Sequence, residues 1–126
     1  MRNVCAVITT PLVRECCEFY ARALDATVID HSEGFARLRF RGFELAFIQP
    51  NQLPRLPMFQ HTAPTRAFSL AIESGNLLLD YDDLIRRGLA PLGPLREFEN
   101  GQRSFALIDP AGTVINFIEP RPQPLF

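Results

Sequence analysis

The nine residues G-F-E-L-A-F-I-Q-P at positions 42–50 return 70 positions later as G-T-V-I-N-F-I-E-P at positions 112–120. The first glycine, the Phe-Ile pair and the last proline fall in register between the two copies. Upstream, Phe35-Ala36 and Phe105-Ala106 keep the same offset. A repeat of this length in a chain of 126 residues predicts two similar halves. Ligand sites often lie between such halves.

The composition predicts one compact globular domain, because 47% of the residues are hydrophobic and 21% are charged. A net charge of −1 gives no electrostatic reason to bind nucleic acid or an anionic membrane. All 13 basic residues are arginines, which excludes Schiff-base chemistry on a lysine. No apolar run approaches 18 residues and the first residues lack a signal-peptide pattern, so we expect a cytoplasmic protein without a membrane anchor.

The cysteines and histidines do not form a recognisable site. Cys5, Cys16 and Cys17 are odd in number, and two of them are adjacent, so neither a disulfide framework nor a zinc motif is indicated. Cys16 belongs to an apolar helical stripe and is expected in the core. His31 and His61 fall in predicted loops and are expected at the surface.

The first half predicts a strand, a helix and three further strands. Residues 3–9 favour a buried strand, and Thr10-Pro11 is typical of a helix start, with Thr10 as N-cap. An apolar stripe continues the helix to Leu24, and a strand follows near 26–31. Alternating residues then predict a hairpin over 36–49, turning at Arg41-Gly42. A two-residue turn would pair Phe40 with Phe43, Arg39 with Glu44, and Arg37 with Ala46.

The second half repeats this order after a proline-rich linker. Alternation of Phe68, Leu70 and Ile72 predicts a strand, and a helical stripe follows from Leu77 to Ile85, closed by Gly88. Three strands are expected near 91–98, 102–108 and 113–119, with a D-P-A-G turn at 109–112. The expected boundaries are module one 1–50, linker 51–65, module two 66–120 and tail 121–126. The fold class is α+β: two β-α-β-β-β modules forming a cupped, mixed eight-stranded sheet, with the helices on its convex side.

Two segments carry a resemblance to a known superfamily. One is Glu18-Phe19-Tyr20 through Leu24, followed by Asp25 where glycine is usual; the other is D-P-A-G-T-V-I-N at 109–116. With the duplication, they make the chain resemble the vicinal oxygen chelate superfamily. That superfamily includes glyoxalase I, extradiol dioxygenases, and the bleomycin- and fosfomycin-resistance proteins. The resemblance covers residues 3 to 120.

The resemblance implies four metal-ligand positions, on the first, fourth, fifth and eighth strands. They fall on Cys5, on Glu44 or Ala46, on Phe68, and on Asn116. Cys5 and Phe68 share an offset of 63. Because a phenyl ring offers no ligand and an amide is a weak one, this set predicts no metal and no cofactor.

Other residues could contact a ligand. Arg37, Arg39 and Glu44 share one sheet face, where the arginines could hold an anionic or oxygen-rich molecule. Alternatively, this face carries only a cross-strand ion pair worth about 0–1 kcal/mol. Four phenylalanines could line an aromatic cavity or pack in the core; they are Phe35, Phe59, Phe68 and Phe98.

The sequence thus predicts a metal-independent binder of a small apolar or aromatic molecule, resembling the drug-sequestering proteins of the superfamily, and a homodimer. The expected ligand-binding residues are Cys5, Arg37, Arg39, Glu44, Phe68 and Asn116. One alternative is a metal-dependent lyase, isomerase or dioxygenase whose ligands include Glu44 and Cys5. Another is an interaction module whose cavity is filled by its own side chains.

Overall fold

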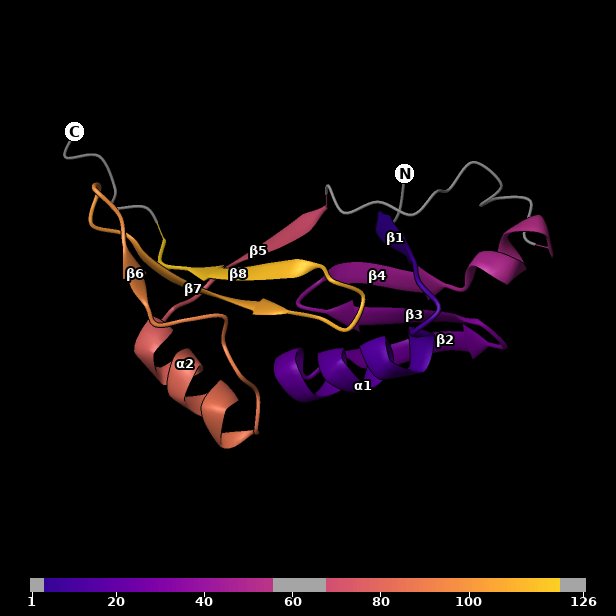
Figure 1. The fold of residues 1–126 in the computed structure, drawn as a ribbon, viewed down its shortest axis with the longest axis horizontal. Helices are drawn as coiled ribbons and strands as arrows, with labels where there is room; N and C mark the ends of the chain where they lie inside the picture. Colours follow the sequence, from indigo (N-terminus) through magenta and orange to yellow (C-terminus); the bar gives the residue numbers. More distant parts are fainter. Residues whose placement is uncertain (1–3, 56–67, 121–126) are drawn as a thin grey trace. The chain divides into compact units, whose positions relative to one another are not determined.

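The computed structural model describes residues 4–55 and 68–120 of the chain (Figure 1). The chain divides into two compact units, residues 1–67 and residues 68–126. Each unit is described by itself below.

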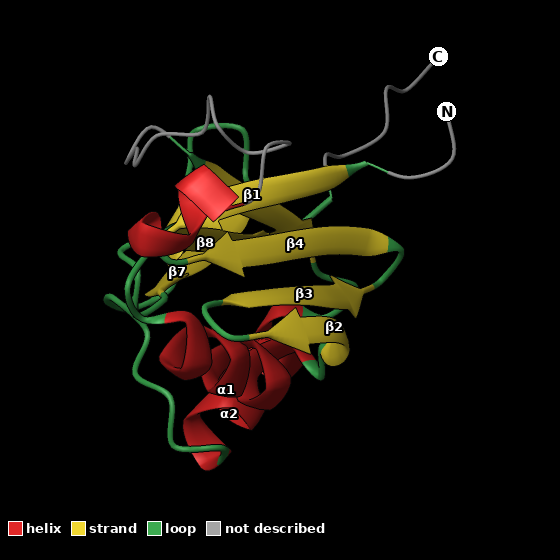
Figure 2. Ribbon diagram, turned by 90° about the vertical axis from the view of Figure 1, so that its right-hand side faces the viewer, coloured by secondary structure: helices red, strands yellow, loops and turns green. Residues whose placement is uncertain are grey.

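Unit 1 is a four-stranded sheet with one helix on one face (Figure 2). The strand order is β1-β4-β3-β2, with β1 parallel to β4 and the other pairs antiparallel. A short 3₁₀ helix follows, which begins at the last residue of the predicted module one and covers the start of the predicted linker. The elements are β1 (Cys5–Thr9), α1 (Val13–Leu24), β2 (Thr27–Ser32), β3 (Phe35–Phe40), β4 (Phe43–Ile48) and η1 (Pro50–Arg55).

Unit 2 repeats the plan with strand order β5-β8-β7-β6, again with its first strand parallel to its last. Its elements are β5 (Ser69–Glu73), α2 (Leu77–Arg86), β6 (Arg96–Glu97), β7 (Arg103–Ile108) and β8 (Val114–Ile118). The predicted α+β class and the twofold β-α-β-β-β order are therefore confirmed. The eight strands are distributed over two four-stranded mixed sheets.

In each unit an aromatic cluster joins the helix to the sheet. The Tyr20 ring of α1 is fully buried and lies 6.0 Å from the Phe40 ring and 5.5 Å from the Phe47 ring. In unit 2, Phe105 stacks on Phe117 at 4.8 Å, and Tyr81 of α2 meets Phe105 edge-on at 5.2 Å. The helix-facing side of each sheet is thus its core side.

The predicted helix and strand ends need two corrections. Helix α1 begins at Val13 rather than after a Thr10 cap; the Thr10 hydroxyl accepts a hydrogen bond from the Leu12 N–H (3.1 Å) outside the helix. The strand predicted over 91–98 is reduced to Arg96–Glu97. Pro91 and Pro94 lack the N–H that a ladder needs, which explains the loss.

The two hairpins differ in their turns. The first has the predicted two-residue turn and pairing, and Arg41 and Gly42 both have positive φ (50° and 75°), as in a type I′ turn. In the second hairpin, the last pair joins Ile108 to Val114, so five residues form the connection.

The longer connection shifts the register of the second hairpin by one residue relative to the first. Phe117, the counterpart of Phe47, pairs with Phe105, whereas Phe47 pairs with Ala36. Phe105 therefore occupies the position in unit 2 that Ala36 occupies in unit 1. The two Phe-Ala pairs keep the same offset in the sequence but do not occupy equivalent positions in the fold. A one-residue shift moves every side chain to the opposite face.

The Asp109 side chain holds the longer turn together. Its buried carboxylate accepts hydrogen bonds from the N–H groups of Ala111 and Thr113, each at 2.9 Å. We expect Asp109→Ala to lower the free energy of unfolding by about 1–3 kcal/mol, because one buried and one partly buried N–H donor lose their partner. The exposed Asp82→Ala on α2 serves as control and should change it by less than about 0.5 kcal/mol in urea titrations. Equal losses in both variants would contradict the structural role of Asp109.

Candidate functional site

The first sheet brings four predicted site residues together on the face away from α1. Glu44 on β4 lies between Cys5 on β1 and Arg39 on β3 in the strand register. Arg37 lies two positions along β3, opposite Ala46. Because side chains alternate along a strand, all four share one face. The predicted cross-strand pairing of Arg39 with Glu44 is confirmed.

The Glu44 carboxylate is already paired within the protein. Arg39 donates from Nη2 to Glu44 Oε2 at 2.8 Å, and Arg37 Nε lies 3.7 Å from Glu44 Oε1. The Glu44 side chain is only 5% exposed, so this is not the fully solvated ion pair that the alternative interpretation assumed. The arginines thus neutralise the carboxylate that lies beside Cys5, which weakens it as a metal ligand.

Cys5 is a weakly acidic thiol beside this cluster. Burial raises the pKa of the Cys5 thiol, the nearby Glu44 carboxylate raises it further, and Arg37 partly opposes both. Burial likewise raises the pKa of Cys17 on α1, with Glu18 adding to the effect. Neither thiol has the lowered pKa that nucleophilic or redox cysteines need. Within residues 4–55 and 68–120, no three His, Cys, Asp or Glu side chains gather closely enough to hold a metal ion.

The register changes how the two halves correspond. Cys5 pairs with Glu44, whose repeat counterpart Val114 pairs with Ser69. Ser69, not Phe68, is therefore the structural counterpart of Cys5. The predicted offset of 63 between Cys5 and Phe68 is wrong. Phe68 lies just before β5. Ala46, not Glu44, is the counterpart of Asn116 in the repeat, although Glu44 and Ala46 share one face.

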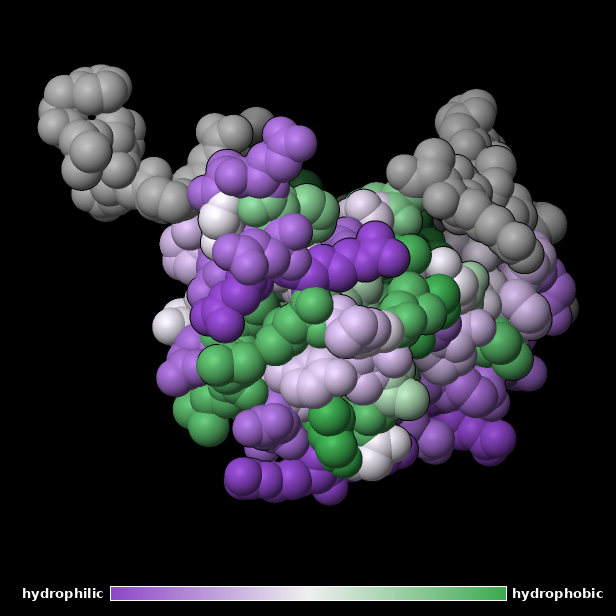
Figure 3. Space-filling model, turned by 60° about the vertical axis from the view of Figure 1, so that its left-hand side comes forward, coloured by the Kyte–Doolittle hydropathy of each residue, from purple (hydrophilic) through white to green (hydrophobic). Residues whose placement is uncertain are grey.

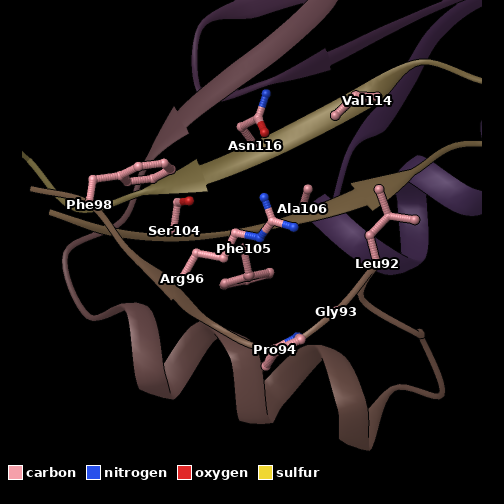
Figure 4. A pocket seen from close by; sticks show the side chains of 10 residues that line it. All are labelled: Leu92, Gly93, Pro94, Arg96, Phe98, Ser104, Phe105, Ala106, Val114 and Asn116. Atoms are coloured by element: carbon pink, nitrogen blue, oxygen red, sulfur yellow. The ribbon is translucent and has the colours of Figure 1, made fainter.

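Asn116 lines a cavity of about 460 Å³ within unit 2 (Figure 4). Four side chains from β7 and β8 form its floor: Ser104, Ala106, Val114 and Asn116. Its wall comes from residues 92–98, namely Leu92, Gly93, Pro94, Arg96 and Phe98. Phe105 also borders it, although its ring points to the other side of the sheet, toward α2 (Figure 4).

Small side chains around Asn116 help to explain the hollow. Asn116 lies between Ala71 on β5 and Ala106 on β7, and Ser69 is opposite Val114. The corresponding face of the first sheet instead carries Arg37 and Arg39 on β3. The two units therefore share a fold but present different surfaces.

Three polar side chains of the cavity form a diagonal row across the strands. Arg96 on β6 is opposite Ser104 on β7, and Asn116 on β8 is opposite Ala106, two residues further along β7. The described part of the chain provides no hydrogen-bond or ion-pair partner for these three side chains. They are therefore available to a ligand.

Sequence reasoning found Asn116 but missed Arg96 and Ser104. The alternation of Phe105 and Leu107 with Ser104 and Ala106 on β7 could have identified the polar face. Phe98 is 53% exposed at the cavity wall, so the core-packing alternative is wrong for this residue. Phe59 and His61 lie outside the described residues.

A second cavity of about 470 Å³ lies within unit 1, where α1 meets the β2–β3 hairpin. It is bordered by Val13 and Cys17 of α1, by Val28 and His31 of β2, and by Phe35. His31 belongs to strand β2 and is exposed, so its prediction as a loop residue is wrong and its prediction as a surface residue is confirmed.

The surface is mixed in polarity. Hydrophobic side chains lie among hydrophilic ones on the face shown in Figure 3. Several exposed large hydrophobic residues belong to unit 2: Leu78, Leu79, Ile85, Leu92, Phe98 and Ile108. None of the helices among the described residues has the length and apolar character needed to cross a membrane.

Three solved structures of similar fold are distant in sequence. A glyoxalase/bleomycin resistance protein/dioxygenase from Nocardioides aligns with a TM-score of 0.77 at 18% identity, covering 100% of this chain and 90% of its own. The bleomycin resistance determinant encoded on transposon Tn5 gives 0.67 at 18% identity, covering 97% of this chain and 100% of its own.

A lactoylglutathione lyase from Agrobacterium tumefaciens gives a TM-score of 0.72 at 12% identity, covering 92% of this chain and 91% of its own. No protein-family model and no curated protein matches the sequence. The chain thus has the fold of glyoxalase and bleomycin resistance proteins, as the sequence resemblance predicted, and identities this low establish the fold alone.

The Cys5 thiol offers a test of the first-sheet cluster. Because the Glu44 carboxylate raises the pKa of Cys5, we expect Glu44→Gln to lower that pKa and shift the pH profile of Cys5 alkylation to lower pH. Site-resolved mass spectrometry of iodoacetamide labelling measures this shift. Cys17, whose pKa responds to Glu18 instead, is the internal control. An unchanged Cys5 profile, or an equal shift at Cys17, would contradict the proximity of Glu44 and Cys5.

Proposed function

We propose that the chain is a metal-independent small-molecule-binding protein that sequesters an apolar or aromatic compound in the cavity of unit 2. The observation that supports it is a cavity of about 460 Å³ with an apolar wall and three polar side chains lacking partners among the described residues. Small-molecule sites are typically cavities of about 300–1,000 Å³ with a few convergent polar groups. The bleomycin resistance determinant of similar fold is consistent with a sequestering role.

The cavity can remove apolar surface from water and orient the ligand. An aromatic group the size of a phenylalanine or tryptophan side chain buries about 150–250 Å², which contributes about 4–6 kcal/mol. Association costs at least about 4 kcal/mol in lost freedom, so apolar burial alone gives weak binding. The polar row must therefore supply part of the affinity. Of the ligand-binding residues predicted from the sequence, Asn116 belongs to this row.

Metal independence is supported by the donor chemistry of both sheets. The cluster on the first sheet offers the Cys5 thiol and the Glu44 carboxylate, and two arginines already pair with that carboxylate. The cavity of unit 2 offers a hydroxyl, an amide and a guanidinium, and the last repels cations. In this proposal Cys5, Arg37, Arg39 and Glu44 form a structural cluster, and Phe68 has no contact that assigns it to a ligand.

The proposal includes a cytoplasmic homodimer. The support for a dimer is the exposure of Leu78, Leu79 and Ile85 on α2, at 48%, 59% and 46%. Apolar side chains on one helix can be buried by a second copy of the same chain. Leu79→Arg should then convert a dimer to a monomer in light-scattering measurements, with Glu99→Arg, at an exposed position between β6 and β7, as control. A wild-type chain that is monomeric at high concentration would contradict this part.

The ligand cavity can be tested by filling it. We expect Val114→Phe to occupy the cavity and abolish the rise in melting temperature that aromatic compounds cause in the wild type. Val28→Phe makes the same change at the cavity of unit 1 and is the matched control.

The same measurement is run with and without EDTA to separate the two functional hypotheses. Binding that persists in EDTA supports the proposal. Ligand binding that requires a bound metal would favour the lyase, isomerase or dioxygenase alternative. If no compound of an aromatic panel shifts the wild-type melting temperature, the binding function is wrong.

A further inference from the structure

We propose that the cavity of unit 2 selects a carboxylate anion with a flat apolar body, held at its carboxylate by Arg96, Ser104 and Asn116. This assignment rests on the small-molecule binding proposed above and specifies its ligand class. Four observations support it: the charge of the lining, the availability of Arg96, the row of donors, and the apolar wall.

The charge of the cavity is positive. Among the described residues that line it, Arg96 is the one charged side chain, and none is acidic. Glu97 is next to Arg96 in the chain but pairs with Arg103 on β7. Adjacent strand residues point to opposite faces, so Glu97 points away from the cavity side. A cationic ligand would therefore meet an exposed guanidinium that no acidic side chain of the lining neutralises, whereas an anion would be attracted.

The neighbouring Arg103, in contrast to Arg96, is already paired with a carboxylate. Its Nε and Nη2 donate to the two carboxylate oxygens of Glu119 at 3.0 and 2.9 Å. Glu119 is therefore already paired with Arg103. Arg96, the first residue of β6, is one position before the strand partner of Arg103 and has no such carboxylate partner among residues 4–55 and 68–120. Its fork of N–H donors remains free for an external carboxylate.

The register aligns two further donors with Arg96. Side chains directly opposite on neighbouring strands lie about 4.5–5.5 Å apart, and diagonal neighbours about 7–8 Å apart. Arg96 is opposite Ser104, and Asn116 is diagonal to Ser104 on β8. Figure 4 shows Ser104 and Asn116 on the same side of the sheet, with the Arg96 guanidinium beside them. One cation and two neutral donors suit a monoanion better than a dianion.

The rest of the cavity suits a flat apolar body. Leu92 and Pro94 form part of the wall, Val114 part of the floor, and the half-exposed Phe98 ring flanks the row of donors (Figure 4). An aromatic ring of the ligand could pack against Phe98 while its carboxylate reaches Arg96. The ligand class is therefore an aromatic or similarly flat carboxylic acid.

The test compares four ligands of one shape by isothermal titration calorimetry: 2-naphthoate, its neutral amide, 2-naphthylmethylamine and 2-naphthyl phosphate. For the wild type we expect naphthoate to bind roughly 10- to 100-fold more tightly than the amide, as a charge-assisted pair predicts. The amine should bind most weakly. Arg96→Gln should reduce the preference for acid over amide to within about threefold and leave the affinity for the amide unchanged.

Matched variants keep the test specific. Arg86→Gln on α2 removes the same charge from unit 2 outside the cavity lining and should preserve the wild-type preference. Arg96→Lys keeps the charge but loses the fork, so it should retain part of the preference. Circular dichroism and melting temperature establish that each variant is folded.

Three outcomes would overturn the assignment. If the amide binds as tightly as the acid, or if Arg96→Gln keeps the full preference, the ligand is not selected as an anion, while the binding function stands. If naphthyl phosphate binds more tightly than naphthoate, the head group is a phosphate monoester and the carboxylate assignment is wrong. If none of the four ligands binds the wild type, the carboxylate assignment fails. The wider aromatic panel described above then decides separately whether the binding function survives.

Discussion

The alternation of side chains across a pleated strand is the constraint on which the rest of this structure depends. In each unit, one face of the sheet is committed to a helix through an aromatic cluster, centred on Tyr20 in unit 1 and on Phe105 in unit 2. Burial of these rings fixes which residues point into the core. The residues between them are then forced to the opposite face, and the chemistry of that face is set by the register.

The two units use this free face differently. In unit 1, the buried Glu44 carboxylate pairs with Arg37 and Arg39, whose side chains stay about half exposed, so the acid is already paired within the protein. In unit 2, small side chains surround Asn116, and Arg96 has no partner among the described residues. Both units therefore have a core between helix and sheet. The opposite face of the sheet carries an ion-pair cluster in unit 1 and a cavity in unit 2.

The fold is shared with proteins described as glyoxalases, dioxygenases, lyases and resistance determinants, at 12–18% identity for those with these names. Such a range of names shows that the architecture does not determine the chemistry. In this chain the decisive features are individual side chains. A guanidinium, an amide and a hydroxyl are hydrogen-bond donors for anionic or polar groups, and they are poor ligands for a divalent metal.

The sequence by itself determined the duplication, the α+β class, the element order and the first hairpin, because hydrophobic periodicity and a glycine turn are local properties of the chain. It also placed Asn116 among the ligand-contacting candidates. It did not determine the equivalence of Phe105 with Ala36 or of Ser69 with Cys5, since both follow from pairing between distant strands. Arg96 and Ser104 become neighbours only when β6 pairs with β7, and whether an arginine is neutralised depends on which carboxylate the folded chain brings within reach.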